Sequence, residues 1–283
     1  MNPALVAARA GLSRGGIEFK QTLTTPRDLI SMLITTGTFL AVMIWTRHTH
    51  VPGTNFSLGT ATLVSVLALD VVYYGVVNVG DLIVVEREDG TLLRAKAIPN
   101  GMLGYLLGKV VNFSGQIAFV VAVTLLVGAF LFTGLAFGRP GSWLTLAWVL
   151  VLGLLATLPL GAVLGSLFPS QRSAGPWWVL MLSGLAVISG IFYPITHLPV
   201  FLQWAGQVFP MYWLGLGMRS ALLPNALAAA EVGHSWRHLA TFGVLSAWAV
   251  AGLVLAPVVL RRMARHESGS AVASRREKVL GRA

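Results

Sequence analysis

The stretch VVEREDGTLLRAKAIPNG, residues 84–101, gathers charge in a chain that is otherwise apolar. It holds two Glu, one Asp, two Arg and one Lys, whereas charged residues make up 11% of the whole sequence. Ionised side chains of both signs form strong charge-assisted hydrogen bonds, so they suit the recognition of another charged surface. With Gly90 and Pro99 as breakers, the pattern predicts a short helix between two turns. That helix either docks on a partner in water or is simply solvated.

Asp70 is the second residue that could do chemistry, because it lies well inside an apolar run. An ionised carboxylate is costly in a hydrocarbon environment, so it must face the bundle interior, a partner or a wet path, or be protonated. Tyr73, Tyr74 and Asn78 follow at three, four and eight residues and share its helical face or lie near it. A role in binding substrate or protons and a structural hydrogen-bond network both fit this pattern.

No nucleotide-binding or catalytic motif accompanies these groups. A phosphate-binding loop needs Gly, four residues and then Gly-Lys-Ser/Thr, but GYLLGKV, residues 104–110, has three intervening residues and ends in Val. The spacing of Gly104 and Gly108 instead predicts close helix packing. The absence of Cys excludes disulfides and thiolate metal sites. We therefore expect a chain that is not an enzyme, holds no metal or cofactor, and draws its energy from a partner.

The composition around these residues is that of an integral membrane protein. The 283 residues are 55% hydrophobic with a mean hydropathy of +0.76, whereas soluble domains are about 45–50% apolar and about 25% charged. A membrane helix needs about 20 apolar residues, and these runs lack the alternation of barrel strands. We expect an all-α integral membrane protein with six transmembrane helices, at about 29–46, 58–80, 110–136, 143–168, 176–193 and 237–260.

The basic residues predict the orientation of the six spans. Sixteen of the twenty Lys and Arg fall on the side that holds both termini, and cytoplasmic segments are the ones enriched in these residues. We therefore expect both termini in the cytoplasm and a location in the plasma (inner) membrane. Residues 1–28 then form a cytoplasmic segment, for which a short amphipathic interfacial helix is favoured over a floppy tail. Residues 261–283 form a basic cytoplasmic tail beside the lipid, and nucleic acid is not an expected partner.

Residues 194–236 are apolar enough to suggest a seventh span, but two observations argue against it. Pro194, Pro199 and Pro210 interrupt any helix there. A seventh crossing would also place the seven basic residues of 261–283 outside. We therefore expect an outer re-entrant element, whose backbone must be covered by protein or by a wet cavity.

Three stretches of the sequence resemble type-2 ABC exporter permeases. EREDGTLLRAKAIPNGMLGYLLGK, residues 86–109, resembles the signature loop of that family, with its Glu-rich start, Gly-Thr-Leu, Pro and Gly-Lys. GIFYPITHLPVFLQWAGQVFPMYWLGLGMR, residues 190–219, resembles its outer segment, where an aromatic-Pro pair and two further Pro precede an Arg. TPRDLI, residues 25–30, is similar to the approach to its first span.

The resemblance implies a membrane subunit that works with a second permease copy, as a homodimer or heterodimer, and with an ABC ATPase that binds ATP and Mg. The loop after the second span would be a cytoplasmic coupling helix in a cleft of the ATPase. It implies roles in ATPase coupling for Glu86, Arg87, Glu88, Gly90, Thr91 and Pro99. The outer element would act as a lid. The residues expected on the transport path or gate are Asp70, Tyr193, Pro194, Pro199, Pro210 and Tyr212.

The resemblance also implies export of a small substrate, and span faces rich in Phe, Leu, Val and Trp suggest an amphipathic or hydrophobic one. A drug or antibiotic, or a lipid-like molecule, is the first expectation, and a lipid-linked glycan is the alternative. The rival class is a secondary transporter driven by an ion gradient, with Asp70 as its coupling carboxylate. An inverted internal repeat would favour that class, and the sequence shows none.

Overall fold

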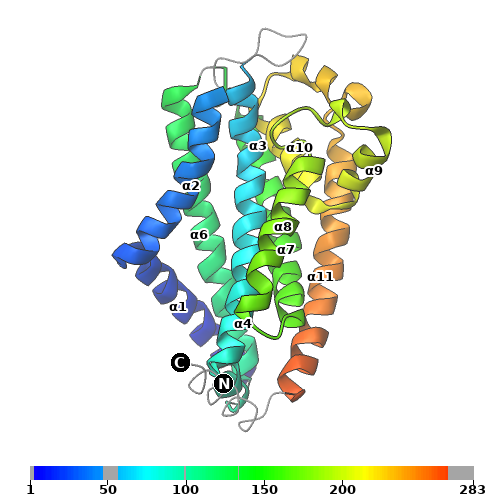
Figure 1. Ribbon diagram of the computed structural model, residues 1–283. Helices are drawn as coiled ribbons and strands as arrows, with labels where there is room; N and C mark the ends of the chain where they lie inside the picture. The colour runs from blue at the N-terminus through cyan, green and yellow to red at the C-terminus, as the bar shows by residue number, and fades with distance from the viewer. Residues whose placement is uncertain (1–2, 47–56, 99, 133, 267–283) are drawn as a thin grey trace.

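The structure is a computed structural model that describes residues 3–46, 57–98, 100–132 and 134–266. Within these residues the chain is all-helical and contains no strand, as the sequence predicts. The long helices stand side by side (Figure 1). Its helices are α1 (Pro3–Thr24), α2 (Pro26–Thr46), α3 (Leu58–Val72), η1 (Tyr73–Asn78), α4 (Val79–Glu88), α5 (Thr91–Lys96), α6 (Gly101–Leu131), α7 (Pro140–Leu167), α8 (Gln171–Ile188), η2 (Ile195–His197), α9 (Val200–Val208), α10 (Pro210–Leu222), η3 (Asn225–Ala230), η4 (Val232–His234) and α11 (His238–His266).

Five helical segments among the described residues are long and apolar enough to cross a membrane. They correspond to five of the six predicted spans. The sixth predicted span, 176–193, is helical only as α8, which ends at Ile188. Because α8 begins with the polar Gln171 and Arg172, its composition falls short of the five, and a sixth crossing stays a prediction. The five segments are Pro26–Trp45, Leu58–Glu88, Gly101–Leu131, Pro140–Leu167 and His238–Met263.

The second span is longer than its apolar run. The prediction ended it at residue 80, but α3, η1 and α4 form one continuous helical rod of 31 residues, Leu58–Glu88. The third span was predicted to begin at residue 110, yet α6 begins at Gly101. The charged stretch is therefore not one loop. Its first part is the end of one long helix, its last part leads into another, and the six-residue α5 lies between them.

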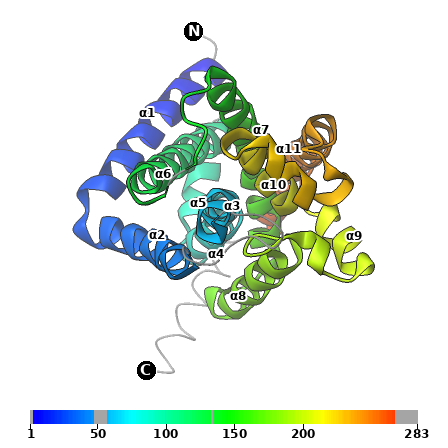
Figure 2. The same cartoon turned by 90° about the horizontal axis from the view of Figure 1, so that it is seen from above.

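Helix α3 is the central helix of the bundle. Thirteen of its fifteen residues are buried, and Figure 2 shows it surrounded by α2, α6, α7 and α10. Helix α10 is the second deeply buried element, with every residue from Pro210 to Arg219 buried. At 13 residues it is too short to span a bilayer. Its cover of protein is what a re-entrant segment requires, although its position relative to a membrane stays a prediction.

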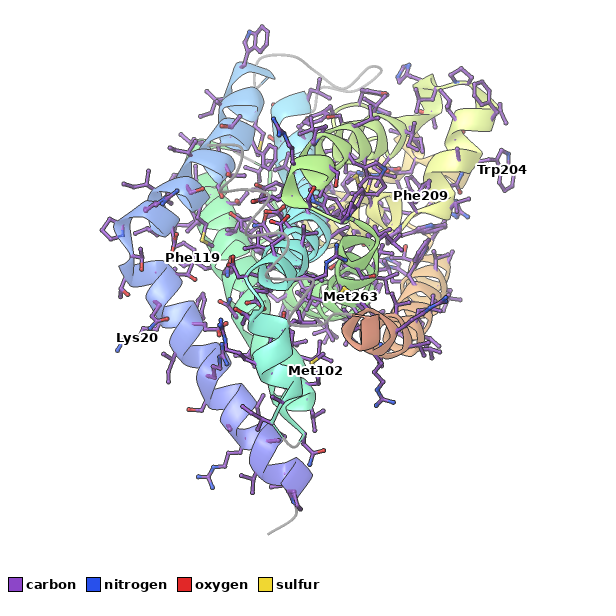
Figure 3. The ribbon with its side chains drawn as sticks, turned by 60° about the horizontal axis from the view of Figure 1, so that its bottom comes forward. Lys20, Met102, Phe119, Trp204, Phe209 and Met263 are labelled. Carbon is purple, nitrogen blue, oxygen red and sulfur yellow. The ribbon has the colours of Figure 1, made fainter. Side chains whose placement is uncertain are left out.

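Helix α1 is longer than the predicted interfacial helix, because it runs for 22 residues from Pro3. It exposes Leu5, Leu12 and Ile17, which are 64%, 49% and 56% accessible. Lys20 also points away from α6 (Figure 3). Apolar and basic side chains on one outer surface suit a helix at a lipid–water boundary. The helix itself is present, and its interfacial location stays a prediction.

Glycines bring α1 and α6 into close contact. A Cβ atom on Gly11 would overlap the backbone of Gly104, and one on Gly15 would overlap the carbonyl oxygen of Gly108. Both helices thus use small residues four apart, which lets their backbones approach. The close packing predicted for Gly104 and Gly108 is confirmed, and its partner is the N-terminal helix.

The α1–α6 contact can be tested with neighbouring glycines of α1. We expect Gly15→Ala to lower the free energy of unfolding by about 1–3 kcal/mol, because the added methyl group forces the helices apart. The matched control is Gly16→Ala, since a Cβ there would meet nothing within 4 Å and Ala is the better helix former. Thermal unfolding in detergent measures both variants, and equal melting temperatures would contradict the packing.

Candidate functional site at the charged elbow

The α3–η1–α4 rod ends at Glu88, and the chain then turns sharply into α5. Gly90 at the turn has φ of 75°, a left-handed conformation that glycine adopts without strain. Leu92 anchors α5 in the bundle at 2% exposure, whereas Arg94 is exposed and Ile98 is 62% exposed. We call residues 86–98 the elbow. Its end of the molecule, the elbow end, also holds the start of α1 and the end of α11 (Figure 1).

An ionic triad joins three helices at the elbow. The Lys109 ammonium of α6 lies 2.9 Å from Glu18 Oε2 of α1 and 2.8 Å from Glu86 Oε1 of α4. The three side chains are largely covered, at 13%, 20% and 11% exposure in that order. Lys109 also lies over the ring of Tyr105, 5.6 Å from its centroid. One cation therefore holds two carboxylates that are far apart in the sequence.

Lys109 and Arg14 stabilise the ionised form of Glu18. Burial alone would raise the pKa of Glu18, but hydrogen bonds and charge from Lys109 and Arg14 outweigh it and hold the pKa below its ordinary value. Because the folded pKa is the lower one, this stabilisation is present above the pKa of unfolded Glu, about 4.3. It is lost as the pH falls through the folded value. Glu18 is thus fully ionised at neutral pH.

Two further charged residues of α4 fasten the end of α7 and the start of α8. Arg87 donates from Nη1 to Ser166 O at 3.3 Å and from Nη2 to Phe168 O at 2.5 Å. These carbonyls lie at the C-terminal end of α7, where a cation is favourable. Glu88 Oε1 accepts a hydrogen bond from Gln171 N at 3.3 Å, at the first residue of α8. The charges of helix α4 therefore contact α6, the end of α7 and α8 directly, and they reach α1 through Lys109.

Arg219 forms the second buried charge cluster, at the opposite end of the bundle, which we call the cap end. Its Nε donates to Glu231 Oε1 at 2.6 Å and its Nη2 to Oε2 at 3.2 Å. Its Nη1 donates to Ser65 Oγ of α3 at 3.0 Å. Arg219 and Glu231 are 5% and 6% exposed. This cluster ties α10 and the segment after η3 to the central helix.

Residues 27–252 match a family model described as ABC-2 family transporter protein. The chain belongs to the ABC-2 family of transporters. The match covers every element from α2 into α11, including the elbow and the cap end. It confirms the predicted type-2 ABC permease and makes this chain a multi-pass membrane subunit of a transporter. No curated protein shows a significant match to the chain.

The charged residues that were predicted to couple the ABC-2 permease to an ATPase mostly have partners within the chain. Glu86 and Glu88 have partners within the chain, and their predicted role in ATPase coupling stays a prediction. Thr91 Oγ1 accepts a hydrogen bond from Arg94 Nη2 at 2.8 Å. Pro99 lies outside the described residues. Among the elbow side chains that the structure describes, the exposed ones are instead four that the sequence reasoning did not single out, Asp89, Arg94, Ala97 and Ile98. The signals in the sequence were the charges of Asp89 and Arg94 and the apolar Ile98 directly before Pro99.

Two of the predicted gate residues of the permease, Tyr193 and Pro194, lie at the cap end. Tyr193 and Pro194 line a small pocket together with Arg219, and Tyr193 donates its hydroxyl to Val187 O at 2.7 Å. The remaining gate residues of the outer element lie in α10 or directly before α9. Pro199 precedes α9, Pro210 begins α10, and Tyr212 is fully buried in α10.

Asp70 stands apart from the other predicted gate residues, fully buried in the last turn of α3 and near the middle of the α3–η1–α4 rod. Thr124 of α6 donates a hydrogen bond to Asp70 Oδ2 at 3.4 Å. Within the part of the chain that the structure describes, Oδ1 accepts no hydrogen bond. Asp70 therefore contacts the membrane-spanning helix α6, whereas the predicted lid residues lie in other parts of the structure.

Removal of the shared cation tests the elbow triad. We expect Lys109→Met to cost about 2–5 kcal/mol of stability, because it leaves two covered carboxylates unpaired. Adding Glu86→Gln should restore part of that loss. Arg14→Met is the control, since Arg14 is 59% exposed beside the same Glu18 and such surface pairs contribute about 0–1 kcal/mol. Thermal unfolding decides, and equal losses for Lys109→Met and Arg14→Met would refute the triad.

The cap cluster predicts a second large loss. Arg219→Met should destabilise the fold by about 3–5 kcal/mol, because the Glu231 carboxylate would be buried without a partner. The double variant Arg219→Met/Glu231→Met should be more stable than the single one, since neither charge remains. Arg139→Met, at an exposed position, serves as the control for loss of an Arg. A double variant less stable than Arg219→Met would overturn this account.

Proposed function

We propose that this permease is driven by a separate ABC ATPase subunit, which binds ATP and Mg and receives α5 in a cleft. The observation that carries the proposal is the elbow: a short helix at the end of the bundle, anchored by the buried Leu92 and preceded by a turn in which Gly90 has a left-handed conformation. Its exposed Asp89, Arg94 and Ile98 offer charges of both signs beside an apolar side chain. A mixed patch of this kind suits a specific protein contact.

Movement of α5 is proposed to reach the membrane part through α4. A displacement of α4 acts on α1 and α6 through Lys109, and on α7 and α8 through Arg87 and Glu88. ATP binding in the partner would thus bias the bundle between two arrangements, one open to each side of the membrane. Because these contacts are polar and directional, the elbow can carry both inward and outward displacement.

The orientation and assembly of the permease belong to the same proposal. The elbow end faces the cytoplasm, so both termini are cytoplasmic in the inner membrane, and α8 forms the sixth crossing. A second permease copy, identical or related, completes the transport path. The segment from Tyr193 to Tyr212 closes that path on the outer side as a lid.

The cargo is proposed to be amphipathic or hydrophobic and to leave the cell. In support, a groove of about 520 Å³ lies between α7, α8, α10 and α11 and is lined mainly by apolar side chains. Trp177, Met181 and Trp248 are among them, and large apolar surfaces of this kind accept hydrophobic ligands. A drug or antibiotic, or a lipid-like molecule, fits this groove, and a lipid-linked glycan is the alternative cargo.

Asp70 supports a second candidate, in which an ion gradient supplies the energy. A buried carboxylate with one oxygen unpaired among the described residues could bind a proton or cation. Family membership favours the ATP-driven candidate. Transport of the cargo into inside-out membrane vesicles distinguishes the two candidates. ATP-driven transport requires ATP and continues in the presence of an ionophore, whereas gradient-driven transport fails with the ionophore and with Asp70→Asn.

The exposed face of α5 provides the sharpest test of the ATPase contact. We expect Arg94→Glu/Ile98→Asp to weaken co-purification of the ATPase at least about tenfold, as for loss of a central interface residue. The bundle itself should keep its melting temperature, because both side chains are exposed. Arg139→Glu is a matched charge reversal at the cap end and should leave co-purification intact.

Glu88→Ala adds a functional arm to this experiment. We expect the variant to insert into the membrane and to bind the ATPase, but to hydrolyse ATP without exporting cargo, because α8 loses one of its two hydrogen bonds to α4 and keeps only the one from Gln171 to Asp81. Export at the wild-type rate would contradict coupling through the elbow.

A further inference from the structure

A polar cavity of about 340 Å³ lies where α1 gives way to α2. Its walls come from α1, α2, η1, α4 and α6, and ten of its thirteen lining residues carry polar side chains. The grooves of about 520 and 570 Å³ elsewhere on this bundle are lined mainly by apolar side chains. Figure 2 shows α1 and α2 as two sides of an L with α6 inside it. The cavity therefore has its own chemistry and its own place in the fold.

The local packing explains why a space opens there. Glycine contacts hold α1 against α6 as far as Gly115, which is covered by the ring of Phe19. Helix α1 then ends at Thr24, and α2 leaves in a new direction. Across the cavity, η1 is a π-helix, in which residues five apart share a row. Tyr73 and Asn78 therefore both face the cavity, although an α-helix would turn them to different faces.

Carboxamide and hydroxyl groups dominate the lining. Gln116 Nε2 donates to Asn112 Oδ1 at 3.1 Å, and both residues are 8% exposed. This bond fixes the two side chains and leaves the Asn112 amino group and the Gln116 carbonyl oxygen for other partners. Asn78 adds a third carboxamide. The hydroxyl groups come from Thr22, Ser31, Thr35, Tyr73 and Tyr74.

The charges around the cavity argue against an anionic ligand. Among the described residues, Lys109 is the one cation in the lining, and its ammonium already holds Glu18 and Glu86. The remaining charged lining residue, Asp28, is acidic and exposed. A phosphate would therefore meet no uncompensated positive charge. Carboxamides and hydroxyls both donate and accept hydrogen bonds, which matches the hydroxyl groups of a sugar or polyol.

We propose that this cavity binds the neutral, hydroxyl-rich head group of a membrane lipid, as in a glycosyl diacylglycerol. The rings of Tyr73 and Phe113 in the lining offer faces for the C–H groups of a sugar. On α2, Ile30 and Ile34 are 55% and 63% exposed, one residue before the lining Ser31 and Thr35. The acyl chains therefore lie along this outer face of α2. Binding requires no ATPase, so the inference stands apart from the proposed function.

Native mass spectrometry of the full chain, released from phosphatidylcholine nanodiscs, tests the lipid class. The discs contain equal amounts of glucosyl diacylglycerol, phosphatidylglycerol and diacylglycerol. We expect retention of the glucosyl lipid above the other two, because it alone offers several hydroxyl groups to the carboxamides without a charge. Preference for phosphatidylglycerol, or no preference, would overturn the proposal. Preference for an added quaternary ammonium amphiphile would also overturn it and would point to Asp28.

Two variants tie retention to the cavity. Asn112→Leu/Gln116→Leu removes a hydrogen-bonded pair together, so no orphan carboxamide remains, and should lower enrichment at least about tenfold. Thr35→Trp fills the cavity and keeps the carboxamides, so it gives the same loss if the first variant misfolds. Gln203→Leu, a carboxamide change at the cap end, is the matched control. Wild-type enrichment in a folded variant of either kind would refute the site.

Discussion

The fold of this permease depends on one constraint: a charge taken out of water must be paired, and here the partners come from distant helices. Lys109 joins α1, α4 and α6 at the elbow end, and Arg219 joins α10, Glu231 and α3 at the cap end. The two clusters hold opposite ends of the same helical rod. Because a lone buried charge is far more costly than a buried pair, the clusters fix which helices meet at each end.

Between these clusters the rod is held by close backbone contact. A Cβ on Gly161 or Gly165 of α7 would overlap the backbone of Gly75 or Gly80 in the rod. Small residues allow this approach where lipid provides no hydrophobic drive for helix association. Helix α7 therefore follows the rod along its length, in addition to the Arg87 contact at its end. The rod and α7 form the part of the bundle best suited to move as a unit.

The elbow contains two groups of side chains with different contacts, although the two groups are close together in the sequence. Glu86, Arg87 and Glu88 bind neighbouring helices of the same chain, whereas Asp89, Arg94 and Ile98 face outward. The division follows from the end of α4 at Glu88, because the inner group belongs to that packed helix, whereas the outer group lies in the turn around Gly90, in α5 or after it. On the proposed function, the inner group transmits force and the outer group receives it.

The all-α membrane class, five of the spans and the ABC-2 family could be predicted from the sequence, because apolar composition and motif order are properties of contiguous residues. The end of the second span could not, since hydropathy falls at Asp81 while the helix continues to Glu88. The roles of the charged residues became visible only in the packed bundle. Glu18 and Lys109 are 91 residues apart in the chain, and Arg219 and Ser65 are 154 apart. No local pattern shows that a carboxylate will meet a cation on another helix, so packing alone decides which charged residues hold the fold and which remain for a partner.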